Sequence, residues 1–344
     1  MAGSDGLRRD GGCDEFNSKE GAYVRKLIHA FCTLATFLAA THAWSQAYPT
    51  RPVIFASAMA AGSSTDILAR ETANALSTRL GQSFIVEVVA GAGGNVAAQK
   101  VVNAQPDGYT LLFVTNSVVS NQAMRKKPEF DITRDLVAIS PLFEGNFGLY
   151  VNPTIPGNTL KDFITHVKAN PGKINYGTSG IGGIVHLVSA DFAIRAGLDI
   201  VHVPYKGGAE YMPATISNQV QFNFFDVATA QPQVDAGKVR LLAVASKQRL
   251  PGLPNVPTFE ESGFPGYTPT FWMGLYAPRN TPQAVIDRLN GEVRAFVAAP
   301  DVKARYAARG YQTIWLPPAD AQKRVADEVA QFNKTIDTLK IERQ

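Results

Sequence analysis

The strongest constraint on the fold is an alternation that begins at Val53, where short runs of β-branched and apolar residues are followed by longer segments with helical periodicity. This alternation is typical of a parallel sheet whose strands are connected by crossover helices. In the first repeat, 53–56 is predicted to be a strand and 66–80 a helix with one apolar face. Gly81 follows, and glycine commonly ends a helix because it adopts a left-handed conformation without steric cost. The sequence therefore predicts an α/β fold.

The alternation forms two series. The first contains predicted strands at 53–56, 84–89 and 110–115 and predicted helices at 66–80 and 95–103. Apolar runs at 137–142 and 148–151 follow, before Asn152-Pro153 breaks the pattern. Helical periodicity resumes at Leu160, behind a capping box of Thr159 and Asp162, and stops at Pro171-Gly172. The second series then contains predicted strands at 174–178, 200–203, 220–225 and 241–245 and predicted helices at 183–196, 209–217 and 229–236.

The chain then returns towards the first series. A proline-rich connector at 251–269 leads to an apolar strand at 271–277. The helices after it begin with Thr281 as N-cap and Pro282 as the first helical residue, and no strand series follows them. We therefore expect two lobes, each a mainly parallel sheet flanked by helices and joined by two crossings at a hinge. Lobe 1 is predicted to contain 48–149 and 273–344, and lobe 2 to contain 150–272.

The N-terminus has the pattern of a secretory signal peptide. Arg25 and Lys26 precede an apolar run at 27–40, and small residues follow at Ala43, Ser45 and Ala47. Cleavage after Ala47 is predicted, with Ala43 as the second choice, and the polar stretch before the signal is interpreted as an N-terminal extension. Residues 1–47 are therefore expected to be removed, and the mature protein is expected in the periplasm.

The charge of the chain argues against nucleic acid as a partner. Lysine and arginine number 33 and aspartate and glutamate 29, which gives a formal net charge of +4. No basic cluster follows the first 30 residues. A nucleic-acid-binding protein needs a concentrated basic surface to neutralise phosphates, and the sequence predicts none.

Three loops that connect a predicted strand to a predicted helix are rich in small residues: 60–65, 91–94 and 178–183. Ligands of open α/β sheets bind at the carboxyl ends of the strands, where these loops lie. Free N–H groups and the helix dipole favour an anion at such a helix start. Glycines also serve simply to make tight turns, but three loops at equivalent positions favour binding. A dinucleotide site is disfavoured, because Gly91 and Gly93 are followed by Val96 where a third glycine is expected.

Catalytic and metal-binding patterns are sparse. The sequence has no nucleophile elbow and no phosphate-binding loop. His166, His186 and His202 lie on separate predicted elements without the spacing of metal ligands, so packing or capping roles are preferred. Asp66 is expected to stabilise a helix start, whereas Asp226, at the end of an apolar strand, either accepts a ligand donor or makes a structural hydrogen bond. These features indicate binding without turnover, cofactor or metal.

Many short segments together resemble one family. They include Tyr48-Pro49-Thr50-Arg51-Pro52-Val53-Ile54, Gly91-Ala92-Gly93-Gly94-Asn95, Pro106-Asp107-Gly108-Tyr109-Thr110-Leu111-Leu112, Pro171-Gly172-Lys173-Ile174-Asn175-Tyr176, His202-Val203-Pro204-Tyr205-Lys206-Gly207 and Gly274-Leu275-Tyr276-Ala277-Pro278. Over nearly all of the predicted mature chain, the sequence resembles the extracytoplasmic receptors of tripartite tricarboxylate transporters, the Bug family. The resemblance implies a two-lobed periplasmic binding protein of type II-like fold that closes on a small carboxylate.

The resemblance also implies a ligand site, held by backbone amides of the first lobe and capped by the second. The candidate ligand-binding residues are Met59, Ala60, Ala61, Gly62, Ser63, Ser64, Thr65, Asp66, Thr115, Asn116, Thr178, Ser179, Gly180, Ile181, Gly182, His186, Tyr205 and Asp226. The chain departs from the family where Met59 replaces a usual aromatic residue and where Ala61-Gly62-Ser63 replaces proline and paired glycines. Val88-Val89-Ala90 replaces a frequent Asn-Arg-Pro. With the aromatic residue lost and Ser63 and Ser64 adding hydroxyls, a ligand more polar than an aromatic acid is expected.

The expected partners are a small organic carboxylate and either membrane permease subunits or a sensor protein, with the receptor acting as a monomer. Dicarboxylates, tricarboxylates, amino acids and aromatic acids all remain open as ligands. Two alternatives remain beside the transport receptor. One is a secreted enzyme that acts on carboxylates, and the other is an orphan receptor that feeds a two-component sensor.

Overall fold

The computed structural model describes residues 48–338 and 340–344, so the predicted signal peptide at 1–47 lies outside the described residues. Residues Arg51–Gln344 form one structural unit. In the part of the chain that the structure describes, no helix is both long and apolar enough to cross a membrane.

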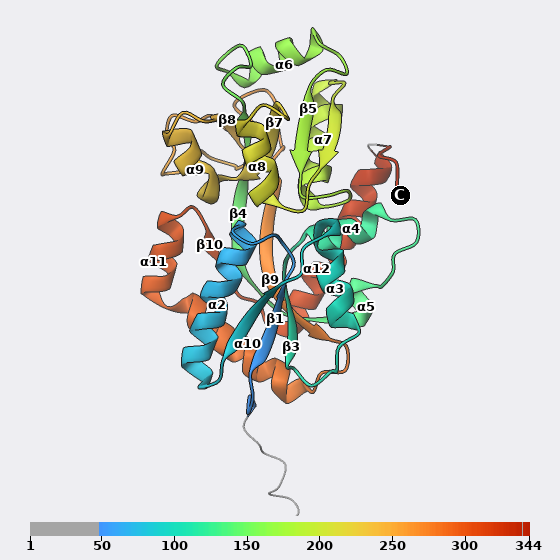
Figure 1. Ribbon diagram of the computed structural model, residues 1–344, viewed down its shortest axis with the longest axis vertical. Coiled ribbons are helices and arrows are strands. Elements are labelled where there is room, and N and C mark those ends of the chain that lie inside the picture. The colour runs from blue at the N-terminus through green and yellow to red at the C-terminus, as the bar shows by residue number, and fades with distance from the viewer. Residues whose placement is uncertain (1–47, 339) are drawn as a thin grey trace, which may run out of the picture. The chain divides into compact units, whose positions relative to one another are not determined.

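Strands and helices alternate along most of the chain, as the sequence predicts (Figure 1). The strands are β1 (Val53–Ser57), β2 (Phe84–Val88), β3 (Thr110–Thr115), β4 (Leu136–Val151), β5 (Asn175–Thr178), β6 (Val201–Pro204), β7 (Phe222–Asp226), β8 (Arg240–Val244), β9 (Thr270–Pro278) and β10 (Gln312–Thr313). The helices are α2 (Ser64–Leu80), α3 (Asn95–Val102), α4 (Ser117–Met124), α5 (Ile132–Asp135), α6 (Leu160–Lys168), α7 (Ile184–Ala196), α8 (Gly208–Ile216), α9 (Val227–Asp235), α10 (Gln283–Ala298), α11 (Pro300–Ala308) and α12 (Pro318–Thr338), with a 3-10 turn η1 (Ala92–Gly94).

The strands form two sheets that share β4. Their order is β2-β1-β3-β9-β4-β7-β5-β6, and β10 and β8 also pair with β4. The first sheet contains β1, β2, β3, β9, β10 and the part of β4 up to Asn146; the second contains β5, β6, β7, β8 and the end of β4 from Phe147. In Figure 1, β4 and β9 run lengthwise through the middle of the molecule. The α/β class is confirmed, while the lobe boundaries at 149/150 and 272/273 stay a prediction.

Both sheets are mixed rather than mainly parallel. β1 is parallel to β2 and β3, and β5 is parallel to β6 and β7, as crossover helices require. β4 and β9, by contrast, are antiparallel to every strand with which they pair. The alternating pattern predicts the parallel pairs, but it carries no information on the direction in which the two long connecting strands enter each sheet.

The region around β4 differs from the prediction. The two apolar runs at 137–142 and 148–151 belong to one strand of 16 residues. Its pairing with β9 shifts register between Ala138 and Ser140 and again between Pro141 and Phe143. Such bulges let one strand bend through two sheets. Polar residues at the bulges and between the runs interrupt the apolar pattern, so the sequence shows two apolar runs where the structure has one strand.

Helix α4 has no counterpart in the prediction. Seven of its eight residues are buried, including Ser117, Ser120 and Asn121. A helix buried on all sides has no polar face, so its sequence lacks the periodicity by which amphipathic helices are found. The buried hydroxyls are satisfied by backbone carbonyls, since Ser117 Oγ donates to Gly93 O at 2.7 Å and the Ser120 hydroxyl lies 2.9 Å from both Ser117 O and Gly182 O.

The predicted end of α2 and the predicted start of α6 agree with the structure, whereas the predicted start of α10 does not. Gly81 ends α2 in the left-handed conformation, and Thr159 with Asp162 forms the predicted capping box of α6. At α10, however, Pro282 rather than Thr281 is the N-cap. The Thr281 hydroxyl donates instead to Pro278 O at 2.8 Å, within the turn that leaves β9.

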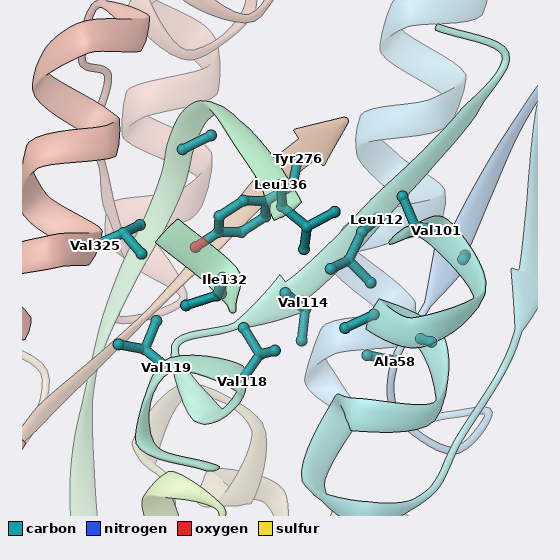
Figure 2. Packing of buried hydrophobic residues seen from close by; sticks show 14 of the residues in the cluster. Ala58, Val101, Leu112, Val114, Val118, Val119, Ile132, Leu136, Tyr276 and Val325 are labelled. Atoms are coloured by element: carbon teal, nitrogen blue, oxygen red, sulfur yellow. The ribbon is translucent and has the colours of Figure 1, made fainter. Parts of the chain in front are cut away.

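A buried apolar cluster fixes α3, α4 and α12 against the first sheet. Figure 2 shows Leu112 from β3, Tyr276 from β9, Val101 from α3, Val118 from α4 and Val325 from α12 meeting in it. Each side chain is at most 1% exposed. Burying an aliphatic side chain of this size stabilises a fold by about 1.5–3 kcal/mol. The cluster therefore holds the end of β3 rigid where it enters the site described next.

Candidate functional site

A cavity that is partly open to solvent lies where strands of both sheets end. It is lined by Met59, Ser63, Ser64, Thr65, Thr115, Phe147, Ser179, Ile184, Val185, Gly208, Tyr211, Phe225, Asp226, Phe271 and Met273. Residues at or just after the carboxyl ends of β1, β3, β5 and β7 line it, together with residues of β4 and β9. This is the position at which open α/β sheets bind ligands.

Four helices begin at this cavity. The first residues of α2 line it, as do Ile184 and Val185 of α7, Gly208 of α8, and Asp226, the N-cap of α9. The first N–H groups of a helix have no partner inside the helix, and the helix dipole adds positive potential there. Among the lining residues there is no lysine, arginine or histidine. Positive potential in the cavity therefore comes from backbone rather than from side chains.

The loop before α2 is held by its own hydrogen bonds. Ser63 is the N-cap, and its hydroxyl accepts from Asp66 N at 3.3 Å. The Asp66 carboxylate accepts from Gly62 N at 3.0 Å and from Arg70 Nε at 3.1 Å. Gly62 has a φ of 79°, a conformation that glycine adopts easily. Asp66 thus braces the loop, in agreement with its expected helix-stabilising role, and it does not line the cavity.

Three hydroxyl-bearing residues of low exposure line the cavity, and their hydroxyls have no partner among the described residues. Thr65, Ser179 and Tyr211 are 2%, 5% and 4% exposed, and none of their hydroxyls makes a hydrogen bond to another described residue. Burial, with the nearby Asp226 charge, raises the pKa of Tyr211, so its hydroxyl stays protonated and able to donate. Each of these hydroxyls can donate one hydrogen bond, so together they offer a ligand in the cavity up to three donors.

Asp226 connects elements of the two sheets. Its carboxylate accepts from Ala228 N at 3.0 Å and Thr229 Oγ1 at 2.8 Å on α9. It also accepts from the Tyr311 hydroxyl, which precedes β10 of the first sheet. Burial raises the pKa of Asp226 to about 6, while hydrogen bonds from Tyr311, Thr229, Ala228 and Ser64 act in the opposite direction. Of the two roles left open for this residue, the structural hydrogen bond is therefore present.

The loop at 91–94 behaves differently from the other two. None of its residues lines the cavity. Its backbone packs against the loop at 180–183, so that a Cβ on Gly180 would lie 3.0 Å from Gly93 N. Asn121 Nδ2 donates to Ala92 O at 3.1 Å and to Gly93 O at 3.0 Å. The anion site expected at this loop stays a prediction, and the glycines allow two backbones to approach.

A pair of histidines contacts the loop at 178–183. The rings of His186 and His202 stack with centroids 4.1 Å apart. Gly182 N donates to His186 Nδ1 at 3.2 Å, and Thr178 Oγ1 lies 2.6 Å from His202 Nε2. Burial lowers the pKa of each histidine to about 4, with His186 also lowering that of His202. Both rings are therefore neutral near pH 7 and serve to position residues 178–182.

The structure brings together seven of the predicted site residues: Met59, Ser63, Ser64, Thr65, Thr115, Ser179 and Asp226. The others do not line the cavity: Ala60, Ala61, Gly62, Asp66, Asn116, Thr178, Gly180, Ile181, Gly182, His186 and Tyr205. Most of these shape the loops that carry the lining residues. Asn116 faces a second cavity, between α7 and α12, and Ile181 is 39% exposed.

Sequence reasoning missed most of the apolar lining, namely Phe147, Ile184, Val185, Tyr211, Phe225, Phe271 and Met273, together with Gly208. In the sequence these residues look like ordinary core positions of strands and helices. Met59 provides no aromatic ring, but Phe147, Phe225 and Phe271 provide aromatic surface in the lining. The cavity is therefore more apolar than the departures at 59–63 suggest.

No group of three or more histidine, cysteine, aspartate or glutamate side chains that could hold a metal ion occurs among residues 48–338 and 340–344.

The profile of the tripartite tricarboxylate transporter family receptor matches residues 68–341. The chain belongs to this receptor family. A relative from Cupriavidus necator, the UPF0065 protein in the gbd 5' region, is 33% identical over 319 residues, which cover 92% of this chain and 97% of the relative. The family consists of periplasmic solute-binding receptors, so the predicted resemblance is confirmed.

Solved structures agree with the receptor's fold. The periplasmic binding protein BugD superposes with a TM-score of 0.82 at 31% identity, over 86% of this chain and 100% of BugD. An R. palustris protein solved with adipate gives a TM-score of 0.83 at 30% identity, over 86% of this chain and 100% of that protein. The predicted periplasmic binding protein fold is confirmed.

Proposed function

We propose that this receptor captures a small organic carboxylate in the cavity between its two sheets and delivers it, as a periplasmic monomer, to the membrane permease of a tripartite transporter. It does so without chemical turnover. The observation that carries the proposal is a cavity on which helix starts converge and which is lined by Thr65, Ser179 and Tyr211, whose hydroxyls have no partner among the described residues. Hydroxyl donors and free backbone N–H groups are the partners that a carboxylate needs.

Family membership supports the transport role, and the adipate in the R. palustris structure supports a carboxylate as ligand. The signal peptide expected at 1–47 fits delivery to the periplasm. The single carboxylate among the lining residues, Asp226, is already held by four donors. These features favour a receptor over the enzyme that the sequence left open.

Closure is proposed to work through the two predicted lobes, 48–149 with 273–344 and 150–272. Ser64 and Tyr311 on one side meet Asp226 on the other, and Ser120 Oγ donates to Gly182 O at 2.9 Å. A ligand that contacts both sides stabilises the closed state, because only that state offers both sets of contacts.

The test is a binding screen with purified mature protein and a panel of carboxylates, read by thermal unfolding and titration calorimetry. A ligand at 100 times its Kd should stabilise the protein by about 2.7 kcal/mol. The ligand should be recovered unchanged. The substitution Thr65→Val should abolish most of this stabilisation, whereas Thr78→Val, at an exposed position of the same helix, should not.

If no carboxylate stabilises the protein, the proposed function is wrong. If a carboxylate is converted to product and Asp226→Asn abolishes the conversion, the enzyme interpretation replaces it. Co-purification with a sensor kinase rather than with permease subunits would redirect the partner assignment to signalling.

A further inference from the structure

The four helix starts at the cavity differ in whether an acidic side chain of the protein already offsets their positive potential. Helix α2 has Asp66 in its first turn, α8 has Glu210, and α9 has Asp226 as its N-cap. Helix α7 begins at the N-cap Gly183, which makes no side-chain capping bond, and its first turn contains no acidic residue. The start of α7 is therefore the one helix start at this cavity that lacks a protein anion.

An unpartnered hydroxyl lies at the same place. Ser179 is 5% exposed, lines the cavity, and has no hydrogen-bond partner among the described residues. A Cβ on Gly183 would lie 3.3 Å from Ser179 Oγ, which places the hydroxyl next to the α7 N-cap. A carboxylate at this point would receive the Ser179 hydroxyl together with the first N–H groups of α7.

The rest of the cavity suits an apolar body. Rings and thioethers from four strands and loops line it: Met59, Phe147, Phe225, Phe271 and Met273. Phe147 and Phe271 pack against each other with ring centroids 4.9 Å apart. Apolar surface of this kind stabilises a ligand by excluding water from it and offers no partner to a second charge.

The only charged side chain in the lining is Asp226, which is negative. A second ligand carboxylate near it would meet a like charge in a buried setting, which is unfavourable. A ligand ammonium group would find a carboxylate that already accepts from Ala228, Thr229, Tyr311 and Ser64. Asp226 therefore disfavours a second anion without offering a vacant place to a cation.

From these observations we infer that the ligand is a monocarboxylate with an uncharged apolar body, its carboxylate at Ser179 and the start of α7 and its body among Phe147, Phe225 and Phe271. This inference rests on the proposed carboxylate-receptor function and narrows it. The specificity is set by one uncompensated helix start and by the negative charge of Asp226.

The experiment compares hexanoate with adipate, which have equal carbon chains and differ by one carboxylate, and 3-phenylpropanoate with L-phenylalanine, which differ by one ammonium group. Calorimetric Kd values are measured on the mature wild-type protein at neutral pH. Hexanoate should bind roughly tenfold or more tightly than adipate, because the second carboxylate gains no partner and meets Asp226. Likewise, 3-phenylpropanoate should bind more tightly than L-phenylalanine.

Asp226→Asn provides a second arm, because it removes the charge and keeps the shape. The ratio of the adipate Kd to the hexanoate Kd should fall several-fold in this variant. A ratio is used because any weakening of closure affects both acids alike and cancels. Thermal unfolding of the variant without ligand shows whether it is folded, and the wild-type comparison decides the inference independently.

The outcomes separate this inference from the function on which it rests. If adipate binds as tightly as hexanoate or more tightly, or if L-phenylalanine binds more tightly than 3-phenylpropanoate, the monocarboxylate inference is wrong while the carboxylate receptor stands. If none of the four acids nor any other carboxylate binds, the receptor function and the inference both fail.

Discussion

Two loops of similar composition serve different purposes in this protein. The loops at 60–65 and 91–94 both follow a parallel strand of the first sheet, both are built of small residues, and both lead into a helix. The first exposes hydroxyls and helix N–H groups to a cavity, whereas the second packs its backbone on the loop at 180–183. Small side chains allow close approach to the backbone of both loops. The tertiary fold decides whether a cavity or another loop lies next to that backbone.

The largest effect is expected from adding one methyl group to the packed loop. Gly93→Ala should lower the free energy of unfolding by about 2–5 kcal/mol, as left-handed strain adds to overpacking. Gly93 has a φ of 61°, and the new Cβ would lie 2.5 Å from Asn121 Nδ2. Gly62→Ala is the matched control, because Gly62 has a φ of 79° but nothing within 4 Å of a Cβ.

In the control Gly62→Ala, the free energy of unfolding should fall only by the contribution of left-handed strain, about 1–2 kcal/mol. Denaturant unfolding of the three proteins measures both values. Equal losses at the two positions would show that the loops do not differ in packing.

A smaller effect, on binding rather than folding, is expected at Ser179. Removing its hydroxyl in Ser179→Ala should weaken ligand binding by about 1.5–3 kcal/mol, the value of a hydrogen bond to a charged group. Stability without ligand should hardly change, because the hydroxyl has no partner within the described part of the protein. Ser83→Ala, at an exposed position, controls for the substitution itself. Unaltered affinity in Ser179→Ala would remove the α7 start from the site.

The contact between the two sheets provides the next comparison, between two buried tyrosines. Tyr311 donates to Asp226, whereas the Tyr276 hydroxyl is buried without a hydrogen-bond partner among the described residues. Tyr311→Phe should lower stability by about 1–2 kcal/mol, because it leaves the Asp226 carboxylate with one donor fewer. Tyr276→Phe should be close to neutral. Chemical denaturation distinguishes the two, and equal effects would argue against a specific role for the Tyr311 contact.

The sequence predicted those features that depend on local chemistry. The capping box at Thr159 and Asp162, the left-handed Gly81 and the parallel strand pairs all follow from residues near one another in the chain. The loops at 60–65 and 178–183 were found for the same reason, since a strand, a small-residue turn and a helix start are consecutive.

Features that depend on tertiary contacts were not predictable. Helix α4 is buried on all sides, so it shows no amphipathic period. Phe147 and Phe271 line the cavity only because β4, which pairs in both sheets, and its neighbour β9 pass beside it. The role of Asp226 depends on Tyr311, which lies 85 residues away in the chain. A single sequence does not show which distant segments meet.

The last prediction concerns the pH dependence of stability and compares Asp226 with the histidine pair. The pKa of Asp226 is raised by burial from 3.8 to about 6, so the folded state holds a proton that the unfolded state releases. The stability that this proton contributes is present below pH 4 and is lost as the pH rises to about 6. His186 and His202, whose pKa values fall from 6.5 to about 4, act in the opposite direction over much of the same range. The pH profile of wild-type stability therefore contains two opposing contributions, and the difference in stability between wild type and Asp226→Asn isolates that of the carboxyl group.

Stability is measured by denaturation at several pH values. The wild type should lose stability relative to Asp226→Asn between about pH 4 and pH 6, and the difference should be constant above that range. A difference that is flat throughout would mean that Asp226 titrates normally and that its burial between the sheets does not persist in solution.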